Sequence, residues 1–105
     1  MASQFWNYQE QVIYSQEKAN KVALGETEAS RSTLWCLLPG QKIKPHVHAG
    51  DHLWVVLEGE GEFLQEGQAA VPITPGMILL APAGESHGVH NSGSQGLVFV
   101  SVSAG

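Results

Sequence analysis

The sequence has little of what marks several common protein classes. A single cysteine, Cys36, excludes a disulfide within the chain, and its place in an apolar run favours a buried structural thiol. Only five Lys and Arg stand against ten Asp and Glu, and they are scattered singly, so no basic patch indicates nucleic acid or an anionic membrane as a partner. No apolar run is long enough to cross a membrane, and no signal peptide is recognisable. We therefore expect a soluble, cytoplasmic protein that binds a small molecule or a second copy of itself.

Helical periodicity is nearly absent as well. From Ser32 onward, short apolar runs alternate with Gly, Pro, Asn or Asp, a spacing typical of an all-β sandwich or barrel. A chain of 105 residues with 43% hydrophobic residues supports one core and therefore a single domain. We expect strands at residues 33–38, 46–48, 52–57, 61–65, 69–73, 77–81, 86–90 and 97–102, with hairpin turns at 58–61, 65–68 and 91–96. The carboxylates of Glu58, Glu60 and Glu62 then lie in a solvated turn rather than in a metal site.

Residues 1–31 are polar with isolated apolar positions. Val12–Tyr14 and Lys21–Leu24 predict two short strands, and residues 26–31 fit a weak helix. The later runs LWVVL, MILL and LVFVSV are apolar on both faces, although a strand with one solvated face alternates. We therefore expect a homodimer in which these outer faces, or the strands of residues 1–31 that cover the barrel core of residues 32–105, pack across the interface. A monomer covered by its own N-terminal segment is the alternative.

Three of the five histidines lie within seven residues, at His46, His48 and His52. Side chains alternate along a strand, so His46 and His48 project to the same side. If the strand after the Ala49–Asp51 turn pairs with the strand before it, His52 returns beside them. His87 supplies a fourth imidazole far downstream, after the turn-rich segment APAGES. Such a set predicts a site for one divalent transition metal, whether Mn, Fe, Co, Ni, Cu or Zn; surface or hydrogen-bonded histidines are the alternative.

The same alternation predicts which side chains surround the histidines. Trp54 shares a face with His52, and Val89 shares a face with His87; by weaker arguments Phe63, Met77 and Phe99 also line a pocket with apolar walls. Plain core packing is the alternative for these residues, and for Val56 it is the stronger one. His90 faces away from His87 and Val89, so we expect it outside the site.

Two motifs carry a resemblance to a known family. Gly76, Pro82, Gly84, His87 and Asn91 match all five fixed positions of the second cupin motif. Gly40, His46, His48 and Gly59 match the first cupin motif, in which His52 stands where the family has a glutamate. The motifs cover residues 40–59 and 76–91. The chain thus resembles a small single-domain cupin.

The resemblance implies an all-β jelly-roll barrel, a double-stranded β-helix, with a metal held inside by the histidines of both motifs. Carried over position by position, His46 and His48 match the paired histidine ligands, His52 the acidic ligand position, and His87 the ligand of the second motif. Gly76, Pro82 and Gly84 match turn positions, and Asn91 is expected to close the following loop through a side-chain to backbone hydrogen bond. The exchange at His52 yields a four-histidine variant of the site.

Cupins include many activities, so the resemblance leaves three functions open. The first is a metal-dependent enzyme, of which a dioxygenase is one form, that acts on a small oxygen-bearing organic molecule. The second is a non-catalytic ligand-binding or sensor protein, favoured by the lack of a carboxylate ligand or a candidate base. The third, a sugar isomerase or epimerase, requires a base inside the barrel, and Lys42 and Lys44 are near the site only in sequence.

Overall fold

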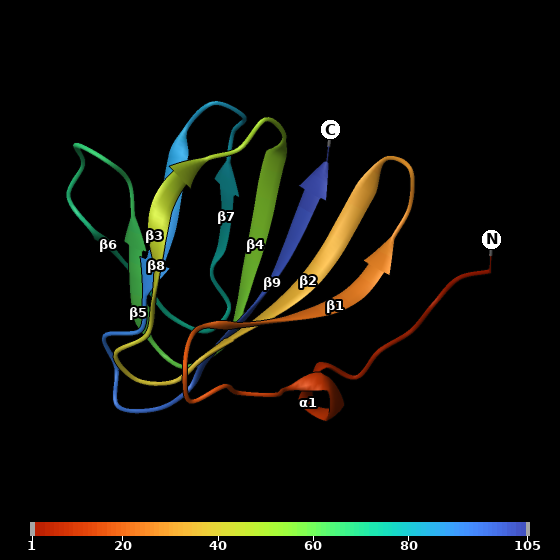
Figure 1. Cartoon of the computed structure of the whole chain (residues 1–105), viewed down its shortest axis with the longest axis horizontal. Coiled ribbons are helices and arrows are strands. Elements are labelled where there is room, and N and C mark those ends of the chain that lie inside the picture. Colours follow the sequence, from red (N-terminus) through yellow and green to blue (C-terminus); the bar gives the residue numbers. More distant parts are fainter. Residues whose placement is uncertain (1, 105) are drawn as a thin grey trace.

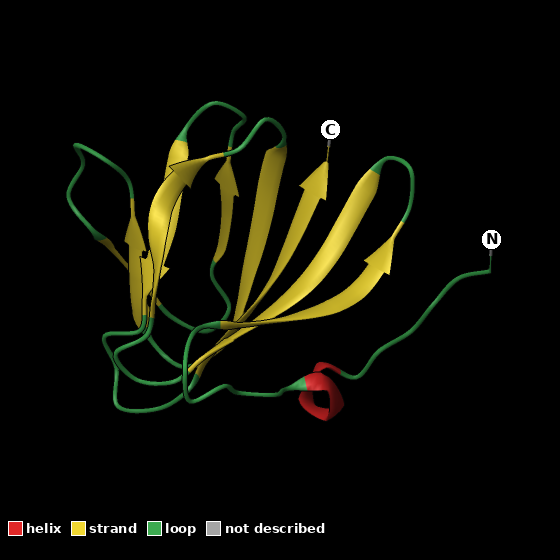
Figure 2. Ribbon diagram, viewed as in Figure 1, coloured by secondary structure: helices red, strands yellow, loops and turns green. Residues whose placement is uncertain are grey.

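The computed structural model describes residues 2–104, and its regular secondary structure is almost entirely β-strand (Figures 1 and 2). In chain order its elements are α1 (Tyr8–Gln11), β1 (Asn20–Glu26), β2 (Ser30–Leu37), β3 (Lys42–Val47), β4 (Asp51–Glu58), β5 (Gly61–Leu64), β6 (Val71–Ile73), β7 (Ile78–Ala81), β8 (Ser86–His90) and β9 (Leu97–Ala104). Within residues 2–104 no helix has the length and apolar character needed to span a bilayer.

The strands form two antiparallel sheets that face each other. One sheet has the order β1-β2-β9-β4-β7, and the other has the order β3-β8-β5-β6. In Figure 1 they stand as two walls that meet near the lower end and separate at the upper end, where the turn between β3 and β4 crosses from one sheet to the other. This arrangement confirms the predicted all-β jelly-roll barrel in a single domain.

The core lies between the sheets because alternate residues of each strand point inward. On β4, Trp54 is 3% exposed and Val56 is buried, whereas Leu53 on the other face is 40% exposed. The Trp54 ring stacks on Phe99 at 4.4 Å and meets Phe63 edge-on at 5.5 Å between centroids. The buried cluster comprises Leu37, Trp54, Val56, Phe63, Ile73, Ala81, Val89, Leu97 and Phe99.

The lower end of the barrel is closed by a buried asparagine. The side-chain amide of Asn91 donates to the carbonyls of Leu37 and Gln95, each at 2.9 Å, and its oxygen accepts from the Gly93 amide at 3.0 Å. Its backbone also exchanges hydrogen bonds with Gly40 and Gln41. The expected loop closure by Asn91 is therefore confirmed, and it ties the end of β8 to the start of β3.

Several local expectations were wrong. Val12–Tyr14 is not a strand; the helix α1 precedes it, and the Asn7 side chain caps α1 by accepting from the Gln9 amide at 3.0 Å. Residues 27–29 form the turn of the β1–β2 hairpin instead of a helix, because the Thr27 hydroxyl accepts from the amides of Ala29 and Ser30. The segments 59–60 and 91–96 cross between the two sheets rather than closing hairpins.

The N-terminal segment covers part of one outer face. Tyr8 and Val12 pack against the buried outer side chains of Leu34, Cys36 and Val98 on β2 and β9. Burial raises the pKa of the Cys36 thiol, as expected for a structural cysteine. The boundary expected after residue 31 falls inside β2, so the chain continues into the barrel without a break there.

Candidate metal centre

The predicted histidines gather at the open end of the barrel, but not through the expected pairing. β3 and β4 belong to different sheets, so the predicted hairpin between them is wrong. β3 pairs instead with β8, which sets His46 opposite His87. His48 follows the end of β3, and the short turn after it crosses the gap between the sheets to His52, the second residue of β4. Both sheets therefore contribute imidazoles to one point.

His48, His52 and His87 form one compact group, with candidate donor atoms within 4.8 Å of one another. Their ring centroids lie 4.2 Å apart for His48 and His52, 4.7 Å for His48 and His87, and 4.8 Å for His52 and His87. Nitrogens bound to one ion at about 2.1 Å lie at most about 4.2 Å from each other. The widest pair must therefore close by at least roughly half an ångström, and by about 1.4 Å at tetrahedral ligand angles, which rotations of the imidazole rings can supply.

His46 lies beside this group rather than within it. Its ring is 4.2 Å from His48 but 5.9 Å from His87, and it is exposed. Its Nδ1 donates to the Lys44 carbonyl at 2.9 Å, which leaves Nε2 with the lone pair that a metal requires. The structure thus brings together three of the four predicted ligands, and a ligand role for His46 stays a prediction.

The inner nitrogen of His87 shows how well this group fits a cation. Its Nδ1 donates to the Glu85 carbonyl at 3.3 Å, so its Nε2 is an acceptor. That Nε2 is buried and has no hydrogen-bond partner among the described residues. His52 is oriented in a similar way, because its Nδ1 lies 3.4 Å from the Ser101 hydroxyl. A buried acceptor left unpaired between two other imidazoles is costly without a ligand, and a divalent ion satisfies it.

The group is held neutral near pH 7 by its own environment. Burial, followed by the neighbouring imidazoles of His52, His46 and His87, lowers the pKa of His48 to about 4. Burial is also the main cause of a lowered pKa at His52 and at His87, where the hydrogen bond to Glu85 opposes it. Neutral imidazoles are the form that binds metal, so protons compete weakly for this site.

The loops that carry the histidines are tied to each other at the rim. The Asp51 carboxylate accepts from the Ala83 amide at 2.9 Å, and the Gly84 amide donates to the His48 carbonyl at 3.0 Å. These contacts join the β3–β4 turn to the β7–β8 turn. Asp51 therefore acts through the backbone of the rim, and no hydrogen bond joins its carboxylate to an imidazole in the described chain.

The histidines open onto a cavity of about 340 Å³. Of the predicted pocket residues, Trp54 lines it, while Phe63, Val89 and Phe99 lie deeper in the packed core. The placement of Met77 was wrong: it ends the turn after β6, is 37% exposed, and its sulfur accepts from the Thr74 amide at 3.3 Å. The indole N–H of Trp54 is buried without an acceptor among residues 2–104.

One part of the cavity wall was not predicted from the sequence, and it comes from β1, β2 and β9. Its residues are Lys21, Arg31, Thr33, Trp35, Ser101 and Ser103. Side-chain alternation along β9 from Phe99 would have predicted that Ser101 and Ser103 also face inward. The inward face of β2 could not be assigned in this way, because it is set by pairing with β9, which is distant in sequence. His90 lies outside the cavity, as expected, with its Nδ1 3.7 Å from a Glu62 oxygen.

The chain is a small β-barrel with imidazoles from both sheets at its open end. Comparison with known proteins identifies the family that has this fold. Residues 33–103 match the Cupin domain family, and the chain belongs to that family. A double-stranded β-helix protein from Klebsiella pneumoniae has a TM-score of 0.92 and 35% identity, covering 98% of this chain and 90% of that one. An rmlc-like cupin protein from Desulfovibrio desulfuricans has a TM-score of 0.86 and 30% identity, covering 97% of both chains.

A curated relative gives a further comparison. The oxalate-binding protein of Thermotoga maritima is 37% identical over 67 residues, which are 63% of this chain. The match spans 54% of that relative, or about half its length.

Proposed function

We propose that the protein binds one divalent transition metal through His48, His52 and His87, with His46 as a fourth ligand, and holds a small oxygen-bearing organic molecule there. The observation that carries this proposal is the buried Nε2 of His87, which lies among the other imidazoles and has no hydrogen-bond partner in the part of the chain that the structure describes. Mn, Fe, Co, Ni, Cu and Zn all accept imidazole ligands, and such an ion supplies Lewis acidity or, if redox-active, electron transfer.

The cavity above the histidines supports a small organic ligand. Its volume of about 340 Å³ is at the lower end of ordinary ligand sites. The name of the Thermotoga relative adds oxalate as the first molecule to test, since oxalate presents two oxygens to one ion. Binding without turnover is the form of this function that the site favours, because the described cavity wall holds no carboxylate that could serve as a base.

Dioxygenase chemistry is the second candidate. It is favoured by the all-imidazole set, which leaves the full charge of the ion available and suits redox-active metals. Sugar isomerase chemistry has less support, because Lys42 and Lys44 are exposed and do not line the cavity. Oxygen uptake by the iron-loaded or copper-loaded protein with β-diketones, catechols and flavonols separates turnover from binding. Uptake by none of them removes the dioxygenase.

Metal analysis of the protein purified without affinity resin tests the proposal. We expect close to one ion per chain, lost in His48→Gln and His87→Gln and retained in the control His90→Gln, which changes an imidazole outside the cavity. Calorimetry should then show oxalate binding to the metal-loaded protein and none to the metal-free protein. Absence of metal from the purified protein and after incubation with all six ions would refute the site.

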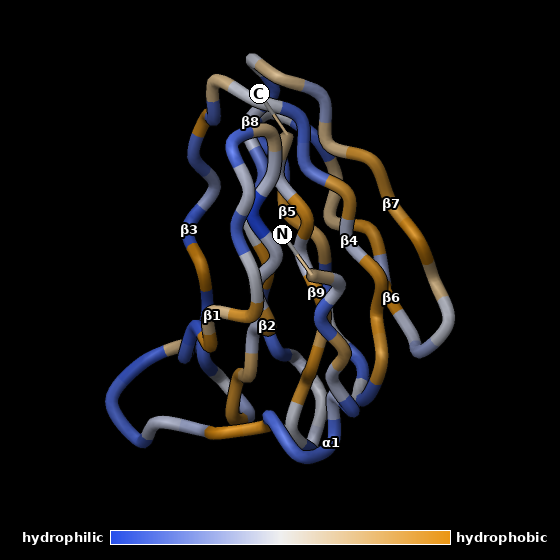
Figure 3. Tube along the Cα trace, turned by 90° about the vertical axis from the view of Figure 1, so that its right-hand side faces the viewer, coloured by the Kyte–Doolittle hydropathy of each residue, from blue (hydrophilic) through white to orange (hydrophobic). Residues whose placement is uncertain are grey.

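We also propose that a second copy of the chain covers the outer face of β4 and β7. Leu53 pairs with Leu80 and Val55 with Ile78, so these residues form one apolar patch, and Ile78 and Leu80 are 66% and 65% exposed. Figure 3 shows hydrophobic stretches along β7 and along β4, its neighbour in the sheet. Light scattering after size exclusion should give a dimer that Leu80→Glu dissociates. Val47→Glu, on β3 in the other sheet, is the matched control; a monomeric wild type contradicts the proposal.

A further inference from the structure

The part of the cavity wall formed by β1 and β2 carries two cationic side chains, Lys21 and Arg31. Along the inward face of the larger sheet, Glu26 pairs with Arg31, Arg31 with Ser103, and Ser103 with His52. Arg31 and His52 are therefore in one row, with one strand between them. Two strand spacings of about 4.8 Å put their backbones about 10 Å apart, a gap that an arginine side chain and a short organic acid fill together.

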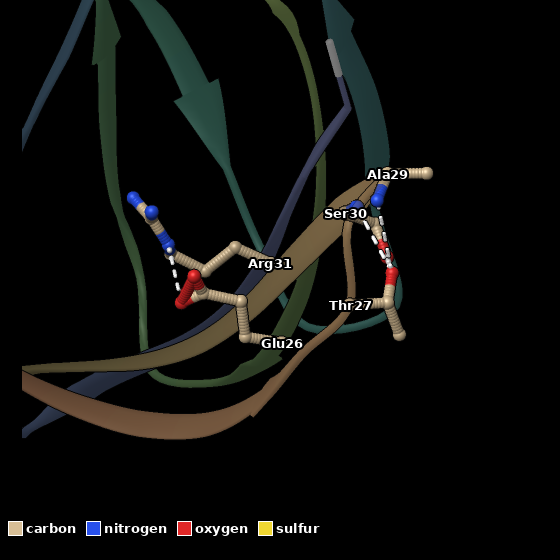
Figure 4. Close-up of polar contacts among 5 residues, drawn as sticks. All are labelled: Glu26, Thr27, Ala29, Ser30 and Arg31. Atoms are coloured by element: carbon tan, nitrogen blue, oxygen red, sulfur yellow. Dashed lines mark hydrogen bonds and ion pairs between the residues drawn. The ribbon is translucent and has the colours of Figure 1, made fainter. Parts of the chain in front are cut away.

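Arg31 is positioned to receive an anion. Within residues 2–104 only its Nε is hydrogen-bonded, to a Glu26 carboxylate oxygen at 3.4 Å, and its two terminal amino groups extend past that carboxylate (Figure 4). The β1–β2 turn that carries the pair is fixed by its own hydrogen bonds, including the Thr27 amide to the Ser30 carbonyl at 2.8 Å. Guanidinium amino groups in this state bind a carboxylate in a two-point contact.

Lys21 adds a second positive charge to the same wall. Its Nζ lies 5.9 Å from the centre of the Trp35 ring, a cation–π contact at the side of the cavity. The described lining therefore contains Lys21 and Arg31 but no carboxylate, in a chain whose ten Asp and Glu outnumber its five Lys and Arg. The charged lining residues are thus cationic in a chain of net negative charge, and Glu26 is ion-paired with Arg31 beside them. Both cations lie on the β1–β2 hairpin, the N-terminal hairpin of the chain, and precede residue 33, where the family match begins.

We propose that the cavity selects organic acids with a second anionic group: one end chelates the metal at the histidines, and the other end binds Arg31, with Lys21 reinforcing the charge. This inference rests on the proposed metal site and names the ligand class for it. Glu26 is then a competitor that occupies Arg31 until the ligand arrives. The N-terminal hairpin becomes the part of the protein that sets selectivity, beyond covering the barrel.

Two four-carbon acids test the proposal. Malate and 2-hydroxybutanoate share the same 2-hydroxy acid head and differ in ending with a carboxylate or a methyl group. Calorimetry on the cobalt-loaded full chain at low salt, with cobalt content checked after each titration, should show malate binding about fivefold tighter, since one exposed charge contact contributes about this much. The preference should shrink as salt is added.

Variants assign the effect to the wall. Arg31→Gln should remove most of the preference for malate and leave the affinity for 2-hydroxybutanoate unchanged. Glu26→Gln should increase the preference for malate, because it frees the guanidinium. Lys42→Gln is the matched control, because it removes one positive charge from an exposed position on β3 outside the cavity. It should change neither affinity.

The outcomes separate this inference from the function on which it rests. Equal affinity for the two acids, or equal losses in Arg31→Gln and Lys42→Gln, would overturn the selectivity while the metal site stands. Binding of oxalate without either hydroxy acid would do the same. If the cobalt-loaded protein binds neither oxalate nor the hydroxy acids, the proposed function fails and the selectivity fails with it.

Discussion

Acid should destabilise the metal-free protein through His48 in particular. Its pKa falls from an ordinary 6.5 in the unfolded chain to about 4 in the folded protein, chiefly because the ring is desolvated and secondarily because three imidazoles surround it. Between these two values the unfolded chain binds a proton that the folded protein does not. The free energy of unfolding therefore falls as the pH is lowered from about 6.5 to about 4, and is unaffected by this group above that window.

The magnitude follows from the two pKa values. For a group with these two pKa values, lowering the pH from about 7.5 to about 5 lowers the free energy of unfolding by about 2 kcal/mol. His48 is only partly buried, so solvent screening reduces the expected effect to about 1 kcal/mol. The lowered pKa values of His52 and His87 act in the same direction.

Urea unfolding in the presence of a chelator, followed by tryptophan fluorescence, measures this effect. The loss of stability between about pH 7.5 and about pH 5 should be about 1 kcal/mol smaller in His48→Gln than in the wild type, because carboxylate titrations cancel in the difference. His90→Gln, which removes an imidazole outside the cluster, should retain the wild-type loss. Equal pH dependence in the wild type and His48→Gln would refute the desolvated cluster as the cause.

Three further predictions concern the framework of the site. Asn91→Ala should lower the free energy of unfolding by about 3 kcal/mol, because three hydrogen bonds at the closed end are lost, and chemical denaturation measures this. Gly88→Ala should prevent metal uptake or folding, since its Cβ would collide with the Ile43 carbonyl across the β3–β8 pair; metal content and circular dichroism report the two outcomes. Ser101→Ala should weaken zinc binding several-fold with little change in stability, because the hydroxyl orients His52, and competition with a chromogenic chelator measures it.

Local patterns predicted most of the strands, because in this fold short apolar runs alternate with turn residues. The expected strand at residues 86–90 coincides with β8, and His52, Trp54 and Val56 share the inward face of β4 as their spacing required. The motif position of Asn91 indicated its role, because a side-chain amide there can hydrogen-bond to the backbone groups of the following loop. These features depend on neighbours within a few residues, which the sequence displays directly.

The missed features depend on partners far away in the chain. Whether the segment after His48 forms a hairpin or crosses to the other sheet is decided by which strands pair, and alternation carries no information on pairing. Arg31 was not predicted for the same reason. It lies in a row with His52 only because β9, about seventy residues later in sequence, lies between β2 and β4. The helix α1 depends on a local asparagine cap that was overlooked beside a β-branched run.

The charge of the site explains why a metal and an anion belong together in this cavity. Three imidazoles with lowered pKa values are neutral near pH 7, so they leave the charge of a divalent ion uncompensated. A carboxylate ligand would usually offset part of this charge. Here His52 occupies the position of that ligand, and the described lining holds no carboxylate. Lys21 and Arg31 then add positive charge at the exposed side of the same cavity, and among the described residues Glu26 is paired only with Arg31. A loaded cavity of this kind is electrostatically incomplete until an anionic ligand enters it, and for that reason we expect organic acids, rather than neutral sugars, to be its ligands.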